Sequence, residues 1–253
     1  MAPTLLQLAE ETTLYLQPRP THETIERDGY VYISGARGGT VHLVRLGDVA
    51  AAVAWTRAES QRRGHHDLTW WVGGSATPAD IHEQLPALGV FVDDEAPMLT
   101  GMTTTAPPPE SEGIEVRRIE TVDEYLAALE TDWEVWQVPA AERAERRVLE
   151  ADRFEAMHAS GVVHHFAAFL GGARVGFGRA IHMDTAVALF GGSVLSYARG
   201  QGVYCALVRA RWDHAVARGT PILVVQAGAM SRPVLAGLGF ESHTEIRLFV
   251  DRL

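Results

Sequence analysis

The feature of this sequence that most constrains its fold is the stretch "VLSYARGQGVYCALVRARWDHAVARG", from Val194 to Gly219. An apolar run ends here, a glycine-rich turn follows, and a long segment with apolar residues at helical spacing begins after Gly202. The pattern predicts a strand, a tight turn and a helix in succession. The next segment, "PILVVQA" at 221–227, is apolar throughout and is typical of a strand buried on both faces.

The turn itself has the chemistry of an anion site. The first N–H groups of a helix have no partners inside it and lie at the positive end of its dipole. Gly200 and Gly202 lack a Cβ, so a bulky anion can approach the backbone, and Arg199 adds a guanidinium. We therefore expect a phosphate or pyrophosphate site, although an ordinary helix N-terminus after a convenient turn would show the same residues.

The elements around the turn follow one order. The pattern predicts a strand at 113–119, helices at 122–136 and 140–157, a hairpin at 162–183 that turns at Gly171-Gly172, and a strand at 186–195. After the turn and its helix come the buried strand, a short helix at 231–240 and a closing strand at 244–253. Alternating strands and helices of this kind predict an α/β fold.

The N-terminal half shows a fainter copy of this order, with strands at 30–35 and 40–46, a helix at 48–64, a strand at 68–74 and a helix at 78–91. We interpret the copy as an internal duplication, with coincidence as the alternative because such orders are common. The stretch 103–113 contains three consecutive prolines and cannot build a core. The predicted domains are therefore 1–105 and 113–253, joined by a linker at 106–112.

Composition narrows the possible partners. The net charge of -10 argues against a nucleic-acid binder. All 22 basic residues are Arg, which excludes a P-loop or Schiff-base lysine and suggests a GC-rich bacterial genome. The single cysteine, Cys205, forms no intrachain disulfide and sits among apolar helical neighbours, where we expect it to be inert. With no basic leader and no long apolar run, we expect a cytoplasmic protein without a membrane partner.

The segment from Arg199 to Tyr204 resembles the acyl-CoA loop of the GCN5-related N-acetyltransferase (GNAT) superfamily, written Gln/Arg-x-x-Gly-x-Gly/Ala. Arg199 and Gly202 match, whereas Tyr204 replaces a small residue and either narrows the site or points into the core. The resemblance implies an α/β (α+β) GNAT fold, with a mixed central sheet flanked by helices. It also implies a tandem of two GNAT-like domains, because the degenerate N-terminal half has only Gly47 and the anionic Asp48 in place of the loop.

The resemblance further implies that the fourth and fifth strands splay apart and that acetyl-CoA, the co-substrate, lies between them. Pantetheine then bonds the fourth-strand backbone, where the N–H of Val194 or Leu195 polarises the thioester carbonyl. The implied acyl-CoA-binding residues are Ser193, Val194, Leu195, Arg199, Gly200, Gln201, Gly202, Val203 and Tyr204.

A tyrosine on the last helix often protonates the leaving thiolate in this superfamily, but Leu235 occupies that place here. The candidate catalytic residues are instead Ser231, Tyr197 and His182. Each has a simpler interpretation: Ser231 as a helix N-cap, Tyr197 as a loop packing residue and His182 as a structural histidine. Gln226 could orient substrate or be a satisfied buried amide.

Two further groups have open interpretations. Glu134 and Trp136 could line an acceptor pocket, or be a helix surface residue and a core aromatic. His164 and His165 point to opposite faces of one strand, so this pair cannot chelate one metal, and the sequence predicts no metal site.

We therefore expect an acyl-CoA-dependent N-acyltransferase, a monomer or homodimer, that transfers acetyl from acetyl-CoA to the amine of a small molecule. An antibiotic, an amino acid or a polyamine-like compound would fit, and the acidic balance suits a cationic acceptor. The alternatives are a non-catalytic acyl-CoA-binding or regulatory protein and a purely structural partner. Turnover of an amine with release of CoA separates the first expectation from both alternatives.

Overall fold

The computed structural model describes residues 2–17, 22–36, 38–96 and 98–253. It divides the chain into two compact units. The first unit contains residues up to Met102 together with 226–236 and 241–253, and the second contains 103–225 and 237–240. Segment 106–112, expected as a linker, is irregular and belongs to the second unit. The division at Met102 and the return of the last strand to the first unit were not expected from the sequence.

The second unit is built on a mixed sheet with the strand order β11-β10-β9-β8-β7. The strands are β7 (Ile114–Ile119), β8 (Val163–Leu170), β9 (Ala173–His182), β10 (Val187–Val194) and β11 (Leu223–Ala227). The first four pair antiparallel, and β11 is parallel to β10. The predicted hairpin between β8 and β9 is confirmed, and its turn uses positive φ angles of 57° at Gly171 and 84° at Gly172, which glycine adopts without strain.

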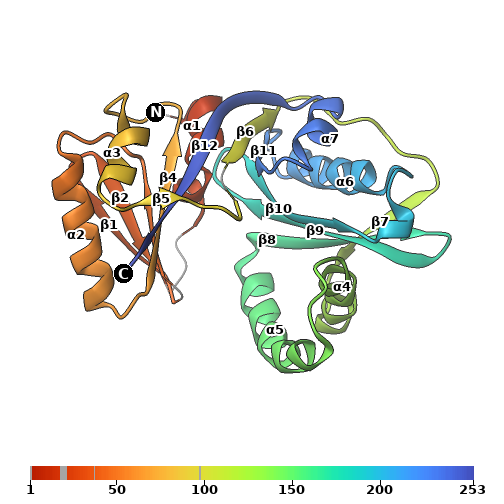
Figure 1. The fold of residues 1–253 in the computed structure, drawn as a ribbon. Helices are drawn as coiled ribbons and strands as arrows, with labels where there is room; N and C mark the ends of the chain where they lie inside the picture. The colour runs from red at the N-terminus through yellow and green to blue at the C-terminus, as the bar shows by residue number, and fades with distance from the viewer. Residues whose placement is uncertain (1, 18–21, 37, 97) are drawn as a thin grey trace. The chain divides into compact units, whose positions relative to one another are not determined.

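Helices cover both faces of this sheet. The helices α4 (Val122–Val135) and α5 (Ala140–Ser160) pack on one face, and α6 (Val203–Ala217) packs on the other (Figure 1). The α4 helix begins at a capping box in which Thr121 and Glu124 bond each other's backbone amides. Its buried face, with α5 and the sheet, forms a core of Ile119, Tyr125, Ala128, Leu129, Trp133, Phe154, Ala167 and Phe177.

The first unit has the strand order β1-β2-β3-β4-β12-β6. Its strands are β1 (Glu23–Arg27), β2 (Tyr30–Ser34), β3 (Gly39–His42), β4 (Asp67–Gly73), β6 (Met98–Thr104) and β12 (Glu241–Arg252), with β5 (Phe91–Val92) paired to β12. Its helices are α1 (Leu5–Glu10), α2 (Val49–Arg62), α3 (Ile81–Ala87) and α7 (Arg232–Gly237). Of these elements, α1, β1, β5 and β6 were not expected from the sequence.

The two units share a strand–helix–strand motif. In the first unit, β3 leads through α2 to β4, and β3 and β4 are parallel neighbours. In the second unit, β10 leads through α6 to β11 with the same parallel pairing. The repeated order of elements seen in the sequence is therefore present in the structure as this strand–helix–strand motif. Within the described parts of the chain, no helix is both long and apolar enough to cross a bilayer.

The last strand completes the first unit. β12 pairs antiparallel with β4, from Ile246 opposite Gly73 to Arg252 opposite Asp67. The buried carboxylate of Asp251 on β12 accepts two hydrogen bonds from Arg57 of α2, at 2.7 and 2.9 Å. A buried carboxylate needs such a partner, which explains why this strand, expected to close the C-terminal half, is held by the first unit.

Candidate functional site

The predicted anion site lies where β10 gives way to α6. A short 3₁₀ turn at Ser196–Ala198 follows β10, and α6 begins with Gly202 at its N-cap, at a φ of +83°. Glycine offers no side chain to occupy the first amides of the helix, so these amides can receive a ligand. Arg199 Nε donates to the carbonyl of Val194 at 3.1 Å, which keeps the guanidinium beside the turn.

The corresponding place in the first unit is closed. Asp48 is the N-cap of α2, and its carboxylate accepts a hydrogen bond from the amide of Ala51 at 2.9 Å. The carboxylate therefore satisfies an amide that an anion would need, and its charge repels one. The two helices are equivalent in architecture but opposite in their fitness for phosphate.

The strands β10 and β11 separate soon after they meet. They pair only at Val187 with Leu223 and Ala188 with Val224, although both strands continue further. A β-bulge interrupts β10 between Phe190 and Gly192. The splay predicted for the fourth and fifth strands is therefore present, and it leaves the second half of β10 unpaired on the β11 side.

The bulge decides which amides face that unpaired side. In an antiparallel ladder, alternate residues turn their N–H and C=O groups toward the same neighbour. The amide of Leu195 donates to Val175 of β9 at 2.9 Å. Alternation then directs the amides of Val194 and Gly192 away from β9. Of the two amides considered in the sequence analysis, only that of Val194 faces the open side.

A residue of α6 contacts the bulge from the face of the sheet that this helix covers. Arg211 is fully buried, and its guanidinium donates to the carbonyl of Gly191 at the bulge and to that of Arg179, both at 3.3 Å. Burial lowers the pKa of Arg211 from its usual value. Tyr204 packs over the strand beside it, because a Cβ at Gly192 would lie 2.7 Å from its ring. Tyr204 is thus half-buried against β10.

On the α4 face, a carboxylate lies beside the same strand. Ser193 is buried, and its hydroxyl donates to Asp132 of α4 at 2.5 Å. Sequence reasoning named Glu134 and Trp136 in this region, but both are exposed, and it missed the half-buried Asp132. The available signal was a carboxylate next to Trp133, a position on the apolar face of the helix.

The three candidate catalytic residues have different local surroundings. Tyr197 is exposed on the 3₁₀ turn just before the loop. The hydroxyl of Ser231 donates to the carbonyl of Gly228 at 3.2 Å, in the first unit. Leu235, in the place of the superfamily's tyrosine, is fully buried.

His182 lies far from the loop. It pairs with Val187 at the start of β10, whereas the loop follows Val194 at its end. Seven residues of strand span about 23 Å. Its ring is 5.2 Å from that of His164 and 5.1 Å from that of His214, a residue that the sequence analysis did not single out.

Gln226, which had two interpretations, and Cys205, which was expected to be inert, both have defined partners. The side-chain amide of Gln226 donates to the carbonyls of Ala9 and Glu10, so it is satisfied. The thiol of Cys205 donates to the carbonyl of Pro109 at 3.1 Å, in the segment expected as a linker.

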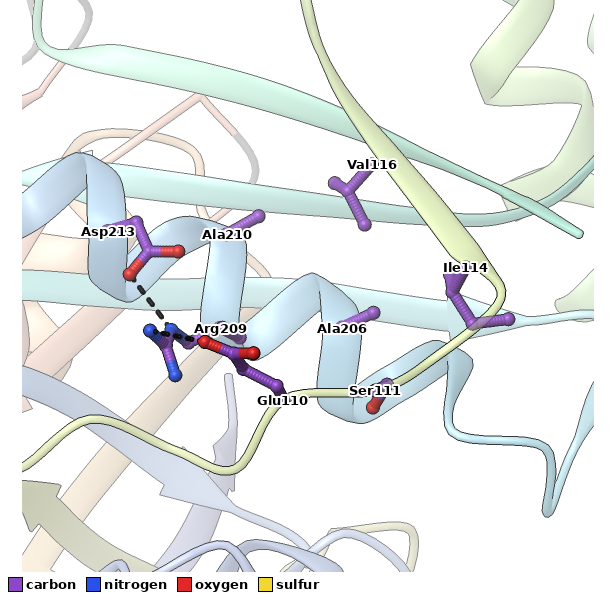
Figure 2. Close-up of a pocket in the computed structure, with 8 residues that line it drawn as sticks. All are labelled: Glu110, Ser111, Ile114, Val116, Ala206, Arg209, Ala210 and Asp213. Carbon is purple, nitrogen blue, oxygen red and sulfur yellow. Dashed lines mark hydrogen bonds and ion pairs between the residues drawn. The ribbon is translucent and has the colours of Figure 1, made fainter.

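That segment borders a shallow hollow of about 260 Å³ beside α6 (Figure 2). The guanidinium of Arg209 is bonded to Asp213 at 2.9 Å and to Glu110 at 3.2 Å, so its charge is already compensated. Ser111 connects the hollow to the loop, because its Oγ lies 3.2 Å from a Cβ built at Gly202. The hollow is lined by Glu110, Ser111, Ile114, Val116, Ala206, Arg209, Ala210 and Asp213.

No family model and no curated protein matches the chain. Solved structures do match. A tandem GNAT protein from the clavulanic acid biosynthesis pathway, solved without acetyl-CoA, is 18% identical with a TM-score of 0.65, over 99% of this chain and 88% of that one. A GCN5-related N-acetyltransferase from Kribbella flavida is 13% identical with a TM-score of 0.71, over 99% and 96%. Another from Sphaerobacter thermophilus is 18% identical with a TM-score of 0.64, over 88% and 76%.

Proposed function

We propose that this chain, which has the tandem fold of the GCN5-related N-acetyltransferases, is an acyl-CoA-dependent N-acyltransferase that transfers acetyl from acetyl-CoA to the amine of a small molecule. The observation that carries the proposal is the uncapped N-terminus of α6 at Gly202, next to the unpaired edge of β10. Helix amides at the end of a strand bind a pyrophosphate, and a strand edge bonds an extended amide chain such as pantetheine.

The loop residues have separate roles in this proposal. The backbone amides from Gly200 to Tyr204 hold the pyrophosphate, with the guanidinium of Arg199 at its side. Pantetheine lies along β10 from Ser193 to Leu195. The amide of Val194 polarises the thioester carbonyl, since the amide of Leu195 is already bonded to Val175.

The transfer needs a neutral amine. The amine nitrogen attacks the thioester carbon, the C–N bond forms, and the C–S bond breaks as the CoA thiolate leaves. We assign Asp132 to the acceptor, where its carboxylate holds the cationic amine until the ammonium gives one proton to solvent. The attacking nitrogen gives a second proton to solvent as the amide forms, and the departing thiolate takes one up. The acidic balance of the chain agrees with a cationic acceptor.

The side-chain acid is the weakest part of the site. Ser231 and Tyr197 remain the candidates, whereas His182 lies about 23 Å of strand from the end of β10. Burial lowers the pKa of His182 to about 3, which makes it a poor base near neutral pH. We propose that water protonates the departing thiolate and that catalysis rests mainly on positioning.

An amine panel with acetyl-CoA tests the proposal, with release of free CoA measured by a thiol reagent. At least one amine should be turned over, with loss of turnover when the loop is altered. Leu235 favours one rival, a non-catalytic acyl-CoA-binding protein, because it cannot donate a proton. Binding of acetyl-CoA without turnover of any amine would support that rival, and absence of binding would overturn both.

A further inference from the structure

Three histidines from three elements of the second unit meet on one face of its sheet. His164 comes from β8, His182 from β9 and His214 from α6. One imidazole nitrogen from each lies within 4.8 Å of the other two. The rings of His164 and His214 are closest, with centroids 4.4 Å apart.

Strand register explains the meeting. His164 pairs with Ala180, and His182 is two residues further along β9, so both side chains point to the same face as diagonal neighbours. The α6 helix covers that face and brings His214 to them. His165 points to the opposite face, where its ring lies 4.6 Å from that of Tyr125.

Some imidazole nitrogen atoms of these three histidines make no hydrogen bond to the residues that the structure describes. The Nε2 atoms of His182 and His214 are buried and bond to nothing among the residues that the structure describes. An unbonded buried nitrogen costs free energy, so its place needs a reason. His164 Nε2 lies 3.1 Å from the carbonyl of Gly161. In the tautomer in which Nε2 donates to this carbonyl, Nδ1 carries the lone pair that can bind a metal.

The contact between His164 and Gly161 also suits a metal ligand. A metal binds neutral imidazole, and a backbone carbonyl that bonds the other ring nitrogen is the usual way to orient the ring.

We propose that His164, His182 and His214 form a binding site for one divalent transition-metal ion, with zinc as the best-suited ion. Three imidazoles and one water complete a tetrahedral zinc site, and zinc–nitrogen distances are about 2.0–2.1 Å. Nitrogen atoms in such a complex are about 3.3 Å apart, so the rings rotate toward one another when the ion enters.

Charged neighbours set limits on the affinity. Arg218 faces all three histidines and Arg118 faces His164 and His214, and both oppose a cation, whereas Glu120 faces His214 and favours one. The site is separate from the acyl-CoA loop, because His214 lies eleven residues after Val203, which is about 16 Å along the helix. A bound ion would join α6 to β8 and β9, and this inference does not rest on the proposed acyltransferase activity.

The test uses the full chain, first stripped of metal. Zn²⁺ alone is then titrated into it in competition with a chromophoric chelator. We expect one ion per chain for the wild type. His214→Ser should weaken binding by about 100-fold or more, since loss of an outer-shell partner alone costs about 10–100-fold. His214→Cys, which differs from it by one atom, should stay within about tenfold of the wild type, because thiolate is a good zinc ligand.

His66 is exposed, so His66→Ser is the matched control and should bind Zn²⁺ as the wild type does. His164→Gln removes a second ligand from a different element, and thermal unfolding confirms that each variant is folded. The visible spectrum of bound Co²⁺ reports whether the site is tetrahedral. The proposal is overturned if the wild type shows no saturable binding, or if the folded His214→Ser and His164→Gln variants bind Zn²⁺ as the wild type does.

Discussion

The hydroxyl of Ser193 on β10 donates a hydrogen bond to the carboxylate of Asp132 on α4, with 2.5 Å between the two oxygens. The bond fixes a negative charge beside the strand that we propose for the thioester. It also leaves the second oxygen of the carboxylate able to accept from an amine.

Asp132→Asn should therefore lower kcat/KM for the amine by about 10- to 100-fold, because a charge-assisted hydrogen bond contributes about 1.5–3 kcal/mol. The dissociation constant of acetyl-CoA should change far less, since in our proposal acetyl-CoA is held by backbone amides of the loop and β10, whereas Asp132 bonds the side-chain hydroxyl of Ser193. Steady-state kinetics and calorimetry measure the two quantities. Glu134→Gln, an exposed carboxylate on the same helix, is the control, and an equal loss in both variants would contradict the role of Asp132.

Acetyl-CoA should bind at one site per chain, although the chain has two similar units. Gly202 leaves the amides of α6 uncapped, whereas Asp48 caps α2 through Ala51. Ligand at about a hundred times its dissociation constant should stabilise the second unit by roughly 2.7 kcal/mol. Calorimetry that gives two equal sites, or none, would contradict this assignment.

Gln201→Glu should weaken acetyl-CoA binding by about tenfold, because it adds a negative charge beside the pyrophosphate. Gln201 is exposed, so the fold should tolerate the change better than a side chain at Gly202, where φ is +83° and Ser111 is close. Gln201→Arg is the opposite-charge control and should bind acetyl-CoA at least as tightly as the wild type. Equal affinities for the two variants would show that the loop does not hold the phosphates.

The stability of the first unit should fall with acid because of His42. This histidine is buried on β3, and burial lowers its pKa from 6.5 to about 3. Its folded pKa is below its unfolded pKa, so the unfolded state binds the extra proton between about pH 6.5 and 3. The stability that depends on neutral His42 is therefore complete above pH 6.5 and is lost as the pH falls, by up to about 1.36 kcal/mol per pH unit.

His42→Gln should remove this dependence and make the loss of stability with acid less steep. Glu11, whose Oε2 lies 3.9 Å from His42 Nδ1, acts in the opposite direction, because burial raises its pKa from 4.5 to about 7. The wild-type curve therefore contains both effects, whereas the curve of the Gln variant contains only that of Glu11. Urea unfolding at pH 7, 6 and 5, followed by two probes to check two-state behaviour, measures the difference. Parallel pH curves for wild type and variant would refute the prediction.

The sequence predicted the parts of the fold that depend on local pattern. The loop at Gly202 and the hairpin turn at Gly171-Gly172 follow from residue types and order, and both are present. The splay of β10 from β11 is also present, and it was expected from the resemblance to the superfamily. The missed features depend on contacts between distant residues. The bulge at Gly191 is supported by Arg211, twenty residues away, and no local pattern reveals a bond of that kind.

Contacts between distant residues also explain why the sequence did not reveal some residues of the sites. Asp132 and Ser193 meet only once α4 packs on the sheet, and His214 meets His164 and His182 only once α6 does. The sequence predicts no metal site because the neighbours His164 and His165 point to opposite faces, and the structure places their rings on opposite faces. Pairing between strands brings His164 and His182 together, and the packing of α6 adds His214.

Catalysis should rest mainly on positioning, so loss of any one candidate acid or base should have a small effect. Leu235 is buried and apolar, and the contacts of the residues that the structure describes single out no side chain to protonate the thiolate. Orientation of two reactants can supply roughly 7–11 kcal/mol, whereas one general acid or base typically contributes about 10²–10⁴-fold. Ser231→Ala, Tyr197→Phe and His182→Ala should therefore each lower kcat by less than about tenfold.

The pH–rate profile should follow deprotonation of the amine acceptor, because only the neutral amine attacks the thioester. A loss beyond about a thousandfold in one of these variants, with acetyl-CoA affinity intact, would identify a true general acid or base and refute this prediction.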